Sequence, residues 1–363
     1  MKLKLLAISD TYIPCAIMGE GLASLRALGV DVEVRHWDHP TLIALQEANL
    51  AIEKGGPAAV ALPPQLLEGI DQFEILIVQF APLPRRTIEA ARRLRLIGVL
   101  RGGVENVDIA AATERGVSVM NTPGRNARAV AECTMGLILS EIRNISRAHA
   151  CLKQGDWRRS FPNSNAIPEL YGKTVGLVGY GAVGRLMAGY LAAFGSRVLA
   201  YDPYCRSDPA PAKLVELAAL LAESDIVSIH ARLTKENYHL IGEKELALMK
   251  PTAILVNTAR SGLVDEGALV RALSERRIMG AALDVFDVEP LPPDHPLLKL
   301  DNVTITPHLA GSTIDAFLNS PKLLAGHVAR ALRGEEDLPI VNGIRPALGT
   351  SAGQLLDSNP QRT

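Results

Sequence analysis

The chain has 363 residues, of which 48% are hydrophobic and 21% charged, and its formal net charge is −1. This composition is typical of a folded globular protein and excludes a largely disordered chain. The length exceeds what one hydrophobic core usually supports, so we expect two domains.

Charge, hydropathy and cysteine usage exclude several kinds of partner. The sequence has no basic block, which argues against nucleic acid. No apolar run reaches the ~18 residues that a membrane span needs, and the start of the chain becomes polar too early for a signal peptide. Four scattered cysteines without metal-ligand spacing indicate reduced thiols and no metal site (Cys15, Cys133, Cys151 and Cys205). We therefore expect a cytoplasmic protein without a membrane partner.

The first 120 residues alternate between short apolar runs and helical patterns. We expect strands at 4–9, 30–34, 75–78 and 96–100, and helices at 19–27, 42–54 and 86–94. This alternation predicts an α/β unit with its own core. After the turn residues at 121–124, apolar spacing predicts a long helix from Ala127 to about Gln154, and residues 161–168 look like an extended connector.

Residues 174–202 carry the most informative pattern of the chain. An apolar strand-like run enters a turn that contains Gly179, Gly181 and Gly184, and a helical pattern follows, which ends near Gly195. A second apolar run then ends at Asp202. In a dinucleotide-binding unit the glycines permit a tight turn, close approach of a pyrophosphate and close helix packing, and the acid accepts hydrogen bonds from the ribose. A plain βαβ turn would leave Asp202 unexplained.

Strand–helix alternation resumes after Asp202. We expect strands at 226–230, 253–257, 280–285 and 303–306, and helices near 214–221, 244–249, 265–276 and 312–332. Polar residues stand at or just past the ends of these strands, and they are Asp202, His230, Asn257, Asp284 and His308. Because ligands of open parallel sheets bind at the carboxyl ends of the strands, we expect the site there.

Three residues beside this unit could carry chemistry. Hydride transfer from a carbinol carbon also requires movement of the hydroxyl proton, and His308 suits that task because histidine titrates near neutral pH. Glu289 could hold the imidazole in one tautomer, and Arg260 could bind a substrate carboxylate through two parallel hydrogen bonds. Alternatively, Arg260 is a surface ion-pair partner, Glu289 caps a turn and His308 is a loop histidine.

Several motifs in order make the chain resemble the NAD-dependent D-isomer-specific 2-hydroxyacid dehydrogenases. The resemblance runs from about Ile97 to Asn342. It rests on GVENVDIAAATERGVSVMNTPG, GDW at 155–157, ELYGKTVGLVGYGAVG, NTARSGLVDEGALVRAL, ALDVFDVEPLP and TPHLAGST. It implies an NAD-dependent enzyme that interconverts a D-2-hydroxy acid and its 2-keto acid.

The resemblance also implies an architecture and residue roles. A Rossmann-type NAD-binding domain (122–309) would be inserted in a flavodoxin-like substrate-binding domain (1–121 and 310–345), both doubly wound α/β sheets, with 346–363 as a flexible tail. Such proteins usually form homodimers through the cofactor domains, and their cleft closes on the substrate. Arg260 would orient the substrate, and His308 would be the acid/base assisted by Glu289. The residues expected near the dinucleotide are Gly179, Gly181, Ala182, Val183, Gly184, Asp202, His230, Thr258, Ala259, Arg260, Asp284, His308 and Gly311.

The expected substrate loop departs from the family pattern. It reads VLRGGVENVD, so Arg101 stands where a small residue is usual, before Gly102 and Gly103. An extra guanidinium would suit a second anionic group on the substrate, such as a phosphate or distal carboxylate. The alternative is a structural salt bridge, for example with Glu105. A phosphorylated or dianionic acid such as 3-phosphoglycerate is therefore one candidate substrate.

Cofactor choice and regulation give two further expectations. The carboxylate of Asp202 would repel the 2′-phosphate of NADP and favour NAD, and Arg206 nearby could soften that preference. Only about 20 residues follow Asn342, so we expect no amino-acid feedback domain and no regulation by serine.

Two other functions fit the same fold. A formate or phosphite dehydrogenase would move hydride without a 2-hydroxy acid. An NAD-sensing corepressor would bind a peptide and need no catalytic set, and the complete set of Arg260, Glu289 and His308 argues against it.

Overall fold

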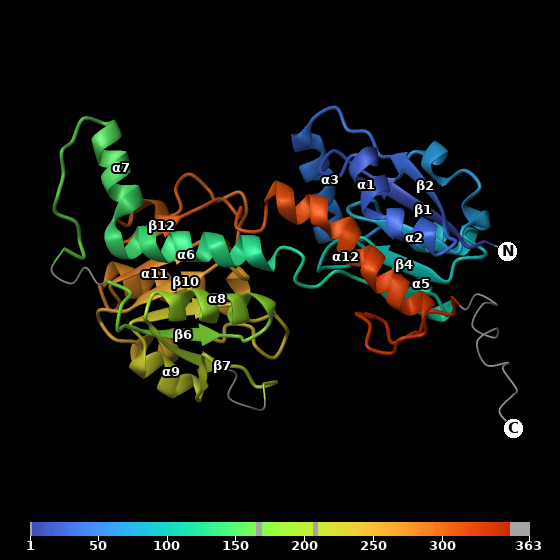
Figure 1. Cartoon of the computed structure of the whole chain (residues 1–363). Coiled ribbons are helices and arrows are strands. Elements are labelled where there is room, and N and C mark those ends of the chain that lie inside the picture. The colour runs from blue at the N-terminus through green and yellow to red at the C-terminus, as the bar shows by residue number, and fades with distance from the viewer. Residues whose placement is uncertain (1, 165–168, 206–209, 349–363) are drawn as a thin grey trace, which may run out of the picture. The chain divides into compact units, whose positions relative to one another are not determined.

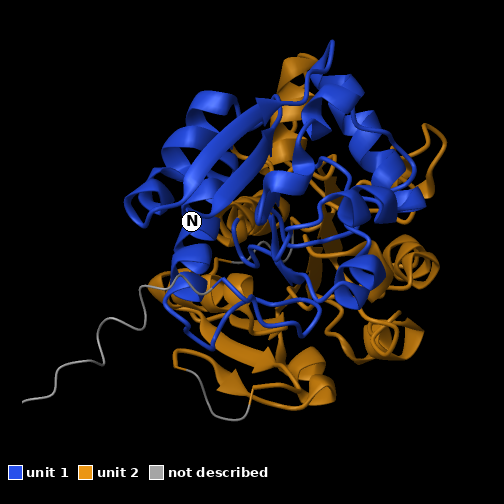
Figure 2. Ribbon diagram, turned by 90° about the vertical axis from the view of Figure 1, so that its right-hand side faces the viewer, with its two compact units in different colours: residues 1–125, 314–363 blue, residues 126–313 orange. Residues whose placement is uncertain are grey.

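The computed structural model describes residues 2–164, 169–205 and 210–348. Two compact units divide the chain, with residues 1–125 and 314–363 in unit 1 and residues 126–313 in unit 2 (Figure 1, Figure 2). Unit 2 is thus one continuous insertion in unit 1. The breaks fall a few residues after the expected boundaries at 121 and 310. Most of the tail expected from residue 346, and residues 165–168 of the expected connector, lie outside the described residues.

Unit 1 alternates short buried strands with helices. Its elements are β1 (Lys4–Ser9), α1 (Cys15–Gly21), α2 (Ala23–Ala27), β2 (Asp31–His36), α3 (Leu42–Gly55), η1 (Pro64–Leu67), η2 (Ile70–Gln72), β3 (Ile75–Val78), α4 (Arg85–Ala90), β4 (Leu96–Val99), α5 (Ile109–Glu114), β5 (Ser118–Met120) and α12 (Ile314–Leu332). Within the described residues its sheet has five parallel strands in the order β2-β1-β3-β4-β5. This order confirms the expected flavodoxin-like sheet.

The sheet of unit 1 is covered on both faces because its strands are apolar on both sides. Leu6 and Ile8 of β1 pack with residues of α3, α4 and α5. The alternate residues Leu5 and Ala7 pack with residues of α1, α2 and α12 on the other face. The last helix of the chain therefore completes the core that the first strands begin.

Unit 2 is a second doubly wound sheet. Its elements are α6 (Ala127–Arg143), α7 (Ile145–Lys153), β6 (Thr174–Val178), α8 (Ala182–Ala193), β7 (Arg197–Tyr201), β8 (Lys213–Leu214), α9 (Leu217–Glu223), β9 (Ile226–Ile229), α10 (Glu243–Leu248), β10 (Ile254–Asn257), η3 (Ser261–Leu263), α11 (Glu266–Ser274), β11 (Gly280–Leu283), η4 (Pro296–Lys299) and β12 (Val303–Ile305). In the part of the chain that is described, the strand order is β12-β11-β10-β9-β6-β7-β8, all parallel. The order reverses between β6 and β9, as in the expected Rossmann-type sheet.

Helices cover both faces of this second sheet. Leu177 and Val198 pack with α6 and α8 on one face. Val178 and Leu199, their neighbours in sequence, pack with α9, α10 and α11 on the other. Successive strand residues therefore enter different cores, as the two-residue period of a strand requires.

The long helix expected from Ala127 to about Gln154 is in fact two helices. Asn144 separates α6 from α7 and adopts a left-handed conformation with φ of 56°. Asparagine tolerates this conformation better than most residues, so the chain can turn without glycine or proline. Figure 1 shows α7 turning away from the line of α6. None of its residues is buried.

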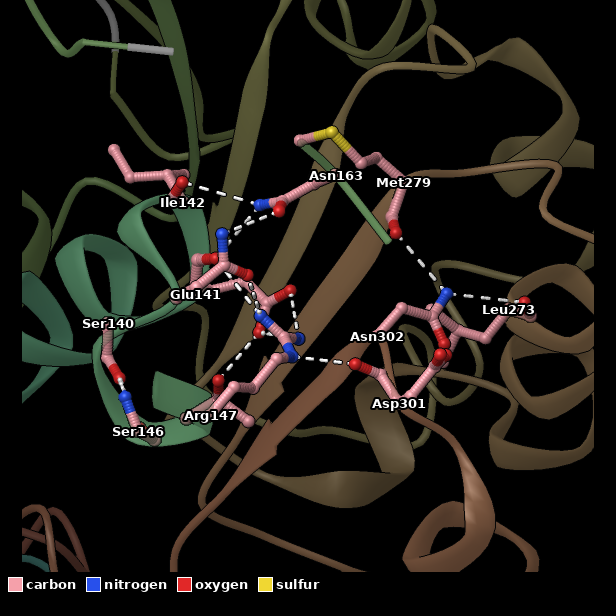
Figure 3. A network of polar contacts seen from close by, with 12 residues as sticks. Ser140, Glu141, Ile142, Ser146, Arg147, Asn163, Leu273, Met279, Asp301 and Asn302 are labelled. Carbon is pink, nitrogen blue, oxygen red and sulfur yellow. Dashed lines mark hydrogen bonds and ion pairs between the residues drawn. The ribbon is translucent and has the colours of Figure 1, made fainter. Parts of the chain in front are cut away.

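A buried polar network holds this turn to the sheet of unit 2 (Figure 3). Glu141 on α6 accepts two hydrogen bonds of 2.7 Å from Arg147 on α7 and a third from Thr304 on β12. Asn163 donates to the main-chain carbonyls of Glu141 and Ile142. Burial raises the pKa of the Glu141 carboxyl, and the nearby Arg147 partly opposes this rise. The network fixes where α7 leaves the domain.

Candidate active site

Polar residues stand at the carboxyl ends of the unit 2 strands, as expected. Asp202 directly follows β7, His230 follows β9 and Asp284 follows β11. Asn257 is the last residue of β10, and His308 comes shortly after β12. Because the strands are parallel, these residues lie along one edge of the sheet.

The glycine turn after β6 lies where the strand order reverses, since β6 pairs with β7 on one side and β9 on the other. Gly179 has φ of 101°, and a Cβ there would lie 2.5 Å from the main-chain nitrogen of Ala231. A Cβ at Gly184 would lie 2.3 Å from the carbonyl oxygen of Gly179, so glycine lets α8 pack against the turn. A Cβ at Gly181 would meet no described atom within 4 Å. No side chain in the described part of the chain caps α8, which begins at Ala182.

These features fit a bound dinucleotide. The main-chain N–H groups at the start of α8 are available to a pyrophosphate, and the space beside Gly181 lets it approach. The Asp202 carboxylate accepts hydrogen bonds from the N–H groups of Tyr180 (2.8 Å) and Tyr204 (2.9 Å), which hold it beside the glycine turn. It keeps lone pairs for ribose hydroxyls. Arg206, expected to temper the cofactor preference, lies outside the described residues.

The main chain of His230 packs against the glycine turn. A Cβ at Gly179 would lie 2.7 Å from the carbonyl carbon of His230. Burial lowers the pKa of the His230 imidazole to about 3, and its Nε2 lies 2.9 Å from the Ser228 hydroxyl. These contacts give His230 a packing role, and its contact with the dinucleotide stays a prediction.

The loop after β10 presents Arg260. Asn257 organises this loop, because its side chain accepts from the N–H of Ala259 and donates to the carbonyl of Arg260. The Thr258 hydroxyl lies 2.8 Å from that of Thr134 on α6. Arg260 is exposed, and its Nη1 donates to the carbonyl of Ala259. Among the described residues no carboxylate lies within ion-pair distance of it, so its guanidinium is available to an anionic ligand.

His308 and Glu289 form a hydrogen-bonded pair. Nδ1 of His308 lies 2.7 Å from Oε2 of Glu289, and the other carboxylate oxygen accepts from the N–H of Phe286 at 3.0 Å. The two side chains are 48% and 33% exposed, so the pair opens to solvent. Its geometry leaves Nε2 of His308 for a substrate. His308 also has φ of 51°, a strained conformation of the kind found at functional sites.

Asp284 shapes the loop that carries His308. Its buried carboxylate accepts hydrogen bonds from the Thr306 hydroxyl (2.6 Å) and from the N–H groups of Leu309 and Ala310 (both 2.9 Å). These donors occupy both carboxylate oxygens. The sequence predicted Asp284 beside the dinucleotide, and the structure adds a role in holding the histidine.

A second carboxylate–histidine pair, which the sequence analysis missed, supports Glu289. Glu266 at the start of α11 lies 3.1 Å from Nε2 of His295 and accepts from the N–H of Asp287 at 3.2 Å. It thereby holds the segment that contains Glu289. The acid in VDEG and the histidine in PPDHP lie about 30 residues apart, and no periodic pattern links them.

Two other residues expected near the dinucleotide have clear local settings. Val183 is half-buried in the first turn of α8. A Cβ at Gly311 would lie 2.2 Å from the side-chain nitrogen of Asn126, so a larger residue there would have to displace that side chain. Their contact with the dinucleotide stays a prediction.

Arg101 in unit 1 is held by protein carboxylates. It pairs closely with Glu53, lies 3.3 Å from Glu105 and donates to the Asn49 side chain at 2.6 Å. A Cβ at Gly103 would lie 2.2 Å from Glu105, so glycine lets this carboxylate fold back. These contacts agree with the alternative expectation, in which Arg101 forms a structural salt bridge with residues such as Glu105. A substrate role for Arg101, Gly102 and Gly103 stays a prediction.

No helix in the described part of the chain is long and apolar enough to cross a membrane. Cys15, Cys133, Cys151 and Cys205 form no disulfide with one another.

Comparison with known proteins places these features in a family. The model of the D-isomer specific 2-hydroxyacid dehydrogenase NAD binding domain matches residues 135–310. A D-3-phosphoglycerate dehydrogenase of Methanocaldococcus jannaschii is 42% identical over 306 residues, which are 82% of this chain and 57% of the relative. The chain thus spans little more than half the length of that relative.

Shorter relatives are covered more fully. A glyoxylate reductase of Thermofilum pendens is 44% identical over 77% of this chain and 84% of its own. The NAD-complexed structure of a D-isomer specific 2-hydroxyacid dehydrogenase from Lactobacillus delbrueckii ssp. bulgaricus superposes with a TM-score of 0.73 at 26% identity, over 93% of this chain and all of the other.

Proposed function

The chain belongs to the D-isomer specific 2-hydroxyacid dehydrogenases, and on that basis we propose that it interconverts a D-2-hydroxy acid and its 2-keto acid with NAD. The observation that carries this proposal is the His308–Glu289 pair of 2.7 Å at the carboxyl edge of a dinucleotide-binding sheet. A proton donor there is what reduction of a keto group requires.

His308 moves the proton in this reaction. With Nδ1 bonded to Glu289, the imidazole presents Nε2, which donates a proton to the keto oxygen in reduction and removes it from the hydroxyl in oxidation. Glu289 stabilises the positive charge that His308 carries in one direction. Asp284 and Glu266 keep the two loops in place, so little reorganisation is needed during the reaction.

Arg260 binds the substrate carboxylate. Its exposed guanidinium can form two parallel hydrogen bonds to a carboxylate and so fix the adjacent carbon. Asn257 holds the main chain of this loop on both sides of Ala259. The residue thus orients the acid while His308 exchanges the proton.

The glycine turn and Asp202 hold the cofactor. The first turn of α8, with Ala182 and Val183, would hold the pyrophosphate, and Asp202 would accept hydrogen bonds from the ribose hydroxyls. The bound nicotinamide supplies the hydride acceptor or donor. The carboxylate of Asp202 favours NAD because it repels a 2′-phosphate.

We also propose a homodimer and a cytoplasmic location. The α7 arm, defined here as residues 145–157, has no buried residue in its helix and exposes Ile145, Leu152 and Trp157. Such apolar side chains favour contact with a second copy. Four cysteines that form no disulfide suit a reducing compartment.

A panel of 2-keto acids tests the proposed reaction. NADH oxidation is followed at 340 nm with glyoxylate, pyruvate, hydroxypyruvate and phosphorylated three- and four-carbon keto acids. We expect turnover of at least one, and a roughly 100- to 10,000-fold loss of kcat/KM in His308→Gln. The control is His327→Gln, since His327 lies on α12 of unit 1 and takes no part in the site. Turnover of formate alone, or equal activity of both variants, would contradict the proposal.

A further inference from the structure

A second arginine of unit 1, Arg125, lies close to Arg101 but has different surroundings. Arg125 follows β5, and its guanidinium lies over the ring of Phe317 on α12 at 5.0 Å. Phe317 stacks on Tyr12 with ring centroids 4.4 Å apart. Arg101 lies over Phe80 in the same way at 5.4 Å. Each of the two guanidinium groups therefore stacks over a phenylalanine ring.

The hydrogen bonds of Arg125 are long and go to uncharged acceptors, so they do not neutralise its charge. Its Nη1 contacts the carbonyl of Ala316 and the hydroxyl of Ser320, both at 3.5 Å, the outer limit of a hydrogen bond. No carboxylate of the described residues lies within ion-pair distance of it. Arg101, in contrast, has the carboxylates of Glu53 and Glu105 beside it.

The electrostatic surroundings of Arg125 favour an anion. Burial, and to a smaller extent the charge of Arg101, lowers the pKa of its guanidinium to about 10. Asp10 opposes these effects, but less strongly than Arg101 acts. The group stays charged at neutral pH and is only partly exposed. A partly buried cation without a paired carboxylate is costly unless a ligand supplies the anion.

The place of Arg125 in the fold is one where ligands bind. Asp10 follows β1, Phe80 follows β3 and Arg101 follows β4. These three strands and β5 lie side by side in the sheet, in the order β1-β3-β4-β5. Arg125 thus belongs to the carboxyl edge of the unit 1 sheet. In open parallel sheets, ligands bind at that edge.

We propose that Arg125, not Arg101, binds a second anionic group of the substrate, a phosphate or a distal carboxylate, and so determines substrate specificity. This inference rests on the proposed function, because it names the residue that selects among 2-keto acids. The ring of Phe317, which stacks on Tyr12, packs against the Arg125 guanidinium and holds it in position.

Matched substrate pairs test this role. Hydroxypyruvate and its 3-phosphate differ only in the phosphate, and pyruvate and oxaloacetate differ only in the distal carboxylate. We expect the wild type to prefer the dianionic member of at least one pair. Arg125→Gln should lower that preference roughly 10- to 100-fold through KM, as expected for loss of a charged hydrogen bond. The smaller keto acids should change by less than about threefold. Arg125→Lys should recover part of the preference, and the exposed control Arg86→Gln should keep it.

Anion binding without turnover gives a second, independent readout. Inorganic phosphate or malonate is titrated into the full chain and the shift in Tm is measured. We expect a saturable rise in the wild type and in Arg86→Gln, and none in Arg125→Gln. If no keto acid is turned over, the proposed function fails, and the titration alone decides the role of Arg125. An unchanged substrate preference in Arg125→Gln, no preference in the wild type, or equal anion binding by all variants would overturn the inference.

Discussion

Asp10 is a buried carboxyl group whose ionisation should weaken unit 1 at neutral pH. It lies after β1 and is 2% exposed, and its Oδ1 accepts hydrogen bonds from the N–H groups of Tyr12 and Ile13. Burial raises its pKa from 3.8 to about 6, although these hydrogen bonds and the charges of His36 and Arg125 oppose the rise. Replacement by asparagine removes the charge and keeps an oxygen that can accept both bonds.

The size of the effect follows from the pKa difference. A rise from 3.8 to about 6 is about 2.2 pH units, or about 3 kcal/mol at 1.36 kcal/mol per unit. Between these values the folded chain binds a proton that the unfolded chain has lost, so the free energy of unfolding falls as pH rises. The stabilising contribution is complete below the lower value and lost above the higher one. Asp10→Asn should therefore match the wild type near pH 3.5 and exceed it by up to about 3 kcal/mol at pH 8.

Urea unfolding at several pH values provides the measurement. Trp37 is buried in unit 1, whereas Trp157 is 79% exposed, so the fluorescence change on unfolding reports mainly on unit 1. Asp71→Asn, which removes an exposed carboxylate of the same unit, is the matched control. A difference between Asp10→Asn and the wild type that stays constant from pH 3.5 to 8 would refute this reasoning. Greater stability of the wild type at pH 8 would do the same.

Three further predictions concern unit 2. Asp202→Ser should lower the preference for NAD over NADP at least ~10-fold in steady-state kinetics, because it removes the repulsion of the 2′-phosphate; a wild type that already prefers NADP would contradict this. Glu141→Gln leaves the charge of Arg147 without its buried partner, so we expect a loss of about 3 kcal/mol and a fall in Tm of roughly 6–12 °C. Glu223→Gln, which breaks an exposed pair, should cost less than about 1 kcal/mol, and equal shifts would disprove the role of burial. Leu152→Arg should convert a dimer to a monomer in sedimentation analysis, and an unchanged sedimentation coefficient would rule out the α7 arm as the contact.

Sequence patterns predicted most of the architecture because they are local. The strand, glycine turn and acid of residues 174–202 lie within one βαβ unit. The apolar strands are short runs with polar ends, so the carboxyl edge of unit 2 could be inferred before the sheet order was known. The His308–Glu289 pair could also be predicted, because its members lie in neighbouring strand-end loops.

What sequence reasoning missed depends on contacts between distant residues. Arg101 meets Asn49 and Glu53 from about 50 residues away, and nothing in the loop itself indicates these partners. The break at Asn144 has no glycine or proline to mark it and follows a continuous apolar pattern. Short strands such as β5 and β8 have too few residues for a period to emerge. The weak pairing of Arg125 is likewise visible only once its neighbours are placed.

The continuity of unit 2 has an evolutionary consequence. Arg260, Glu289, His308 and the glycine turn all lie within residues 126–313, whereas Arg101 and Arg125 lie in the flanking sequence. Recombination at the two ends of unit 2 would therefore transfer all the residues proposed for hydride transfer to another protein. If Arg125 selects the substrate, as we propose, substitutions in the flanking sequence can change which acid is accepted without altering the residues proposed for hydride transfer.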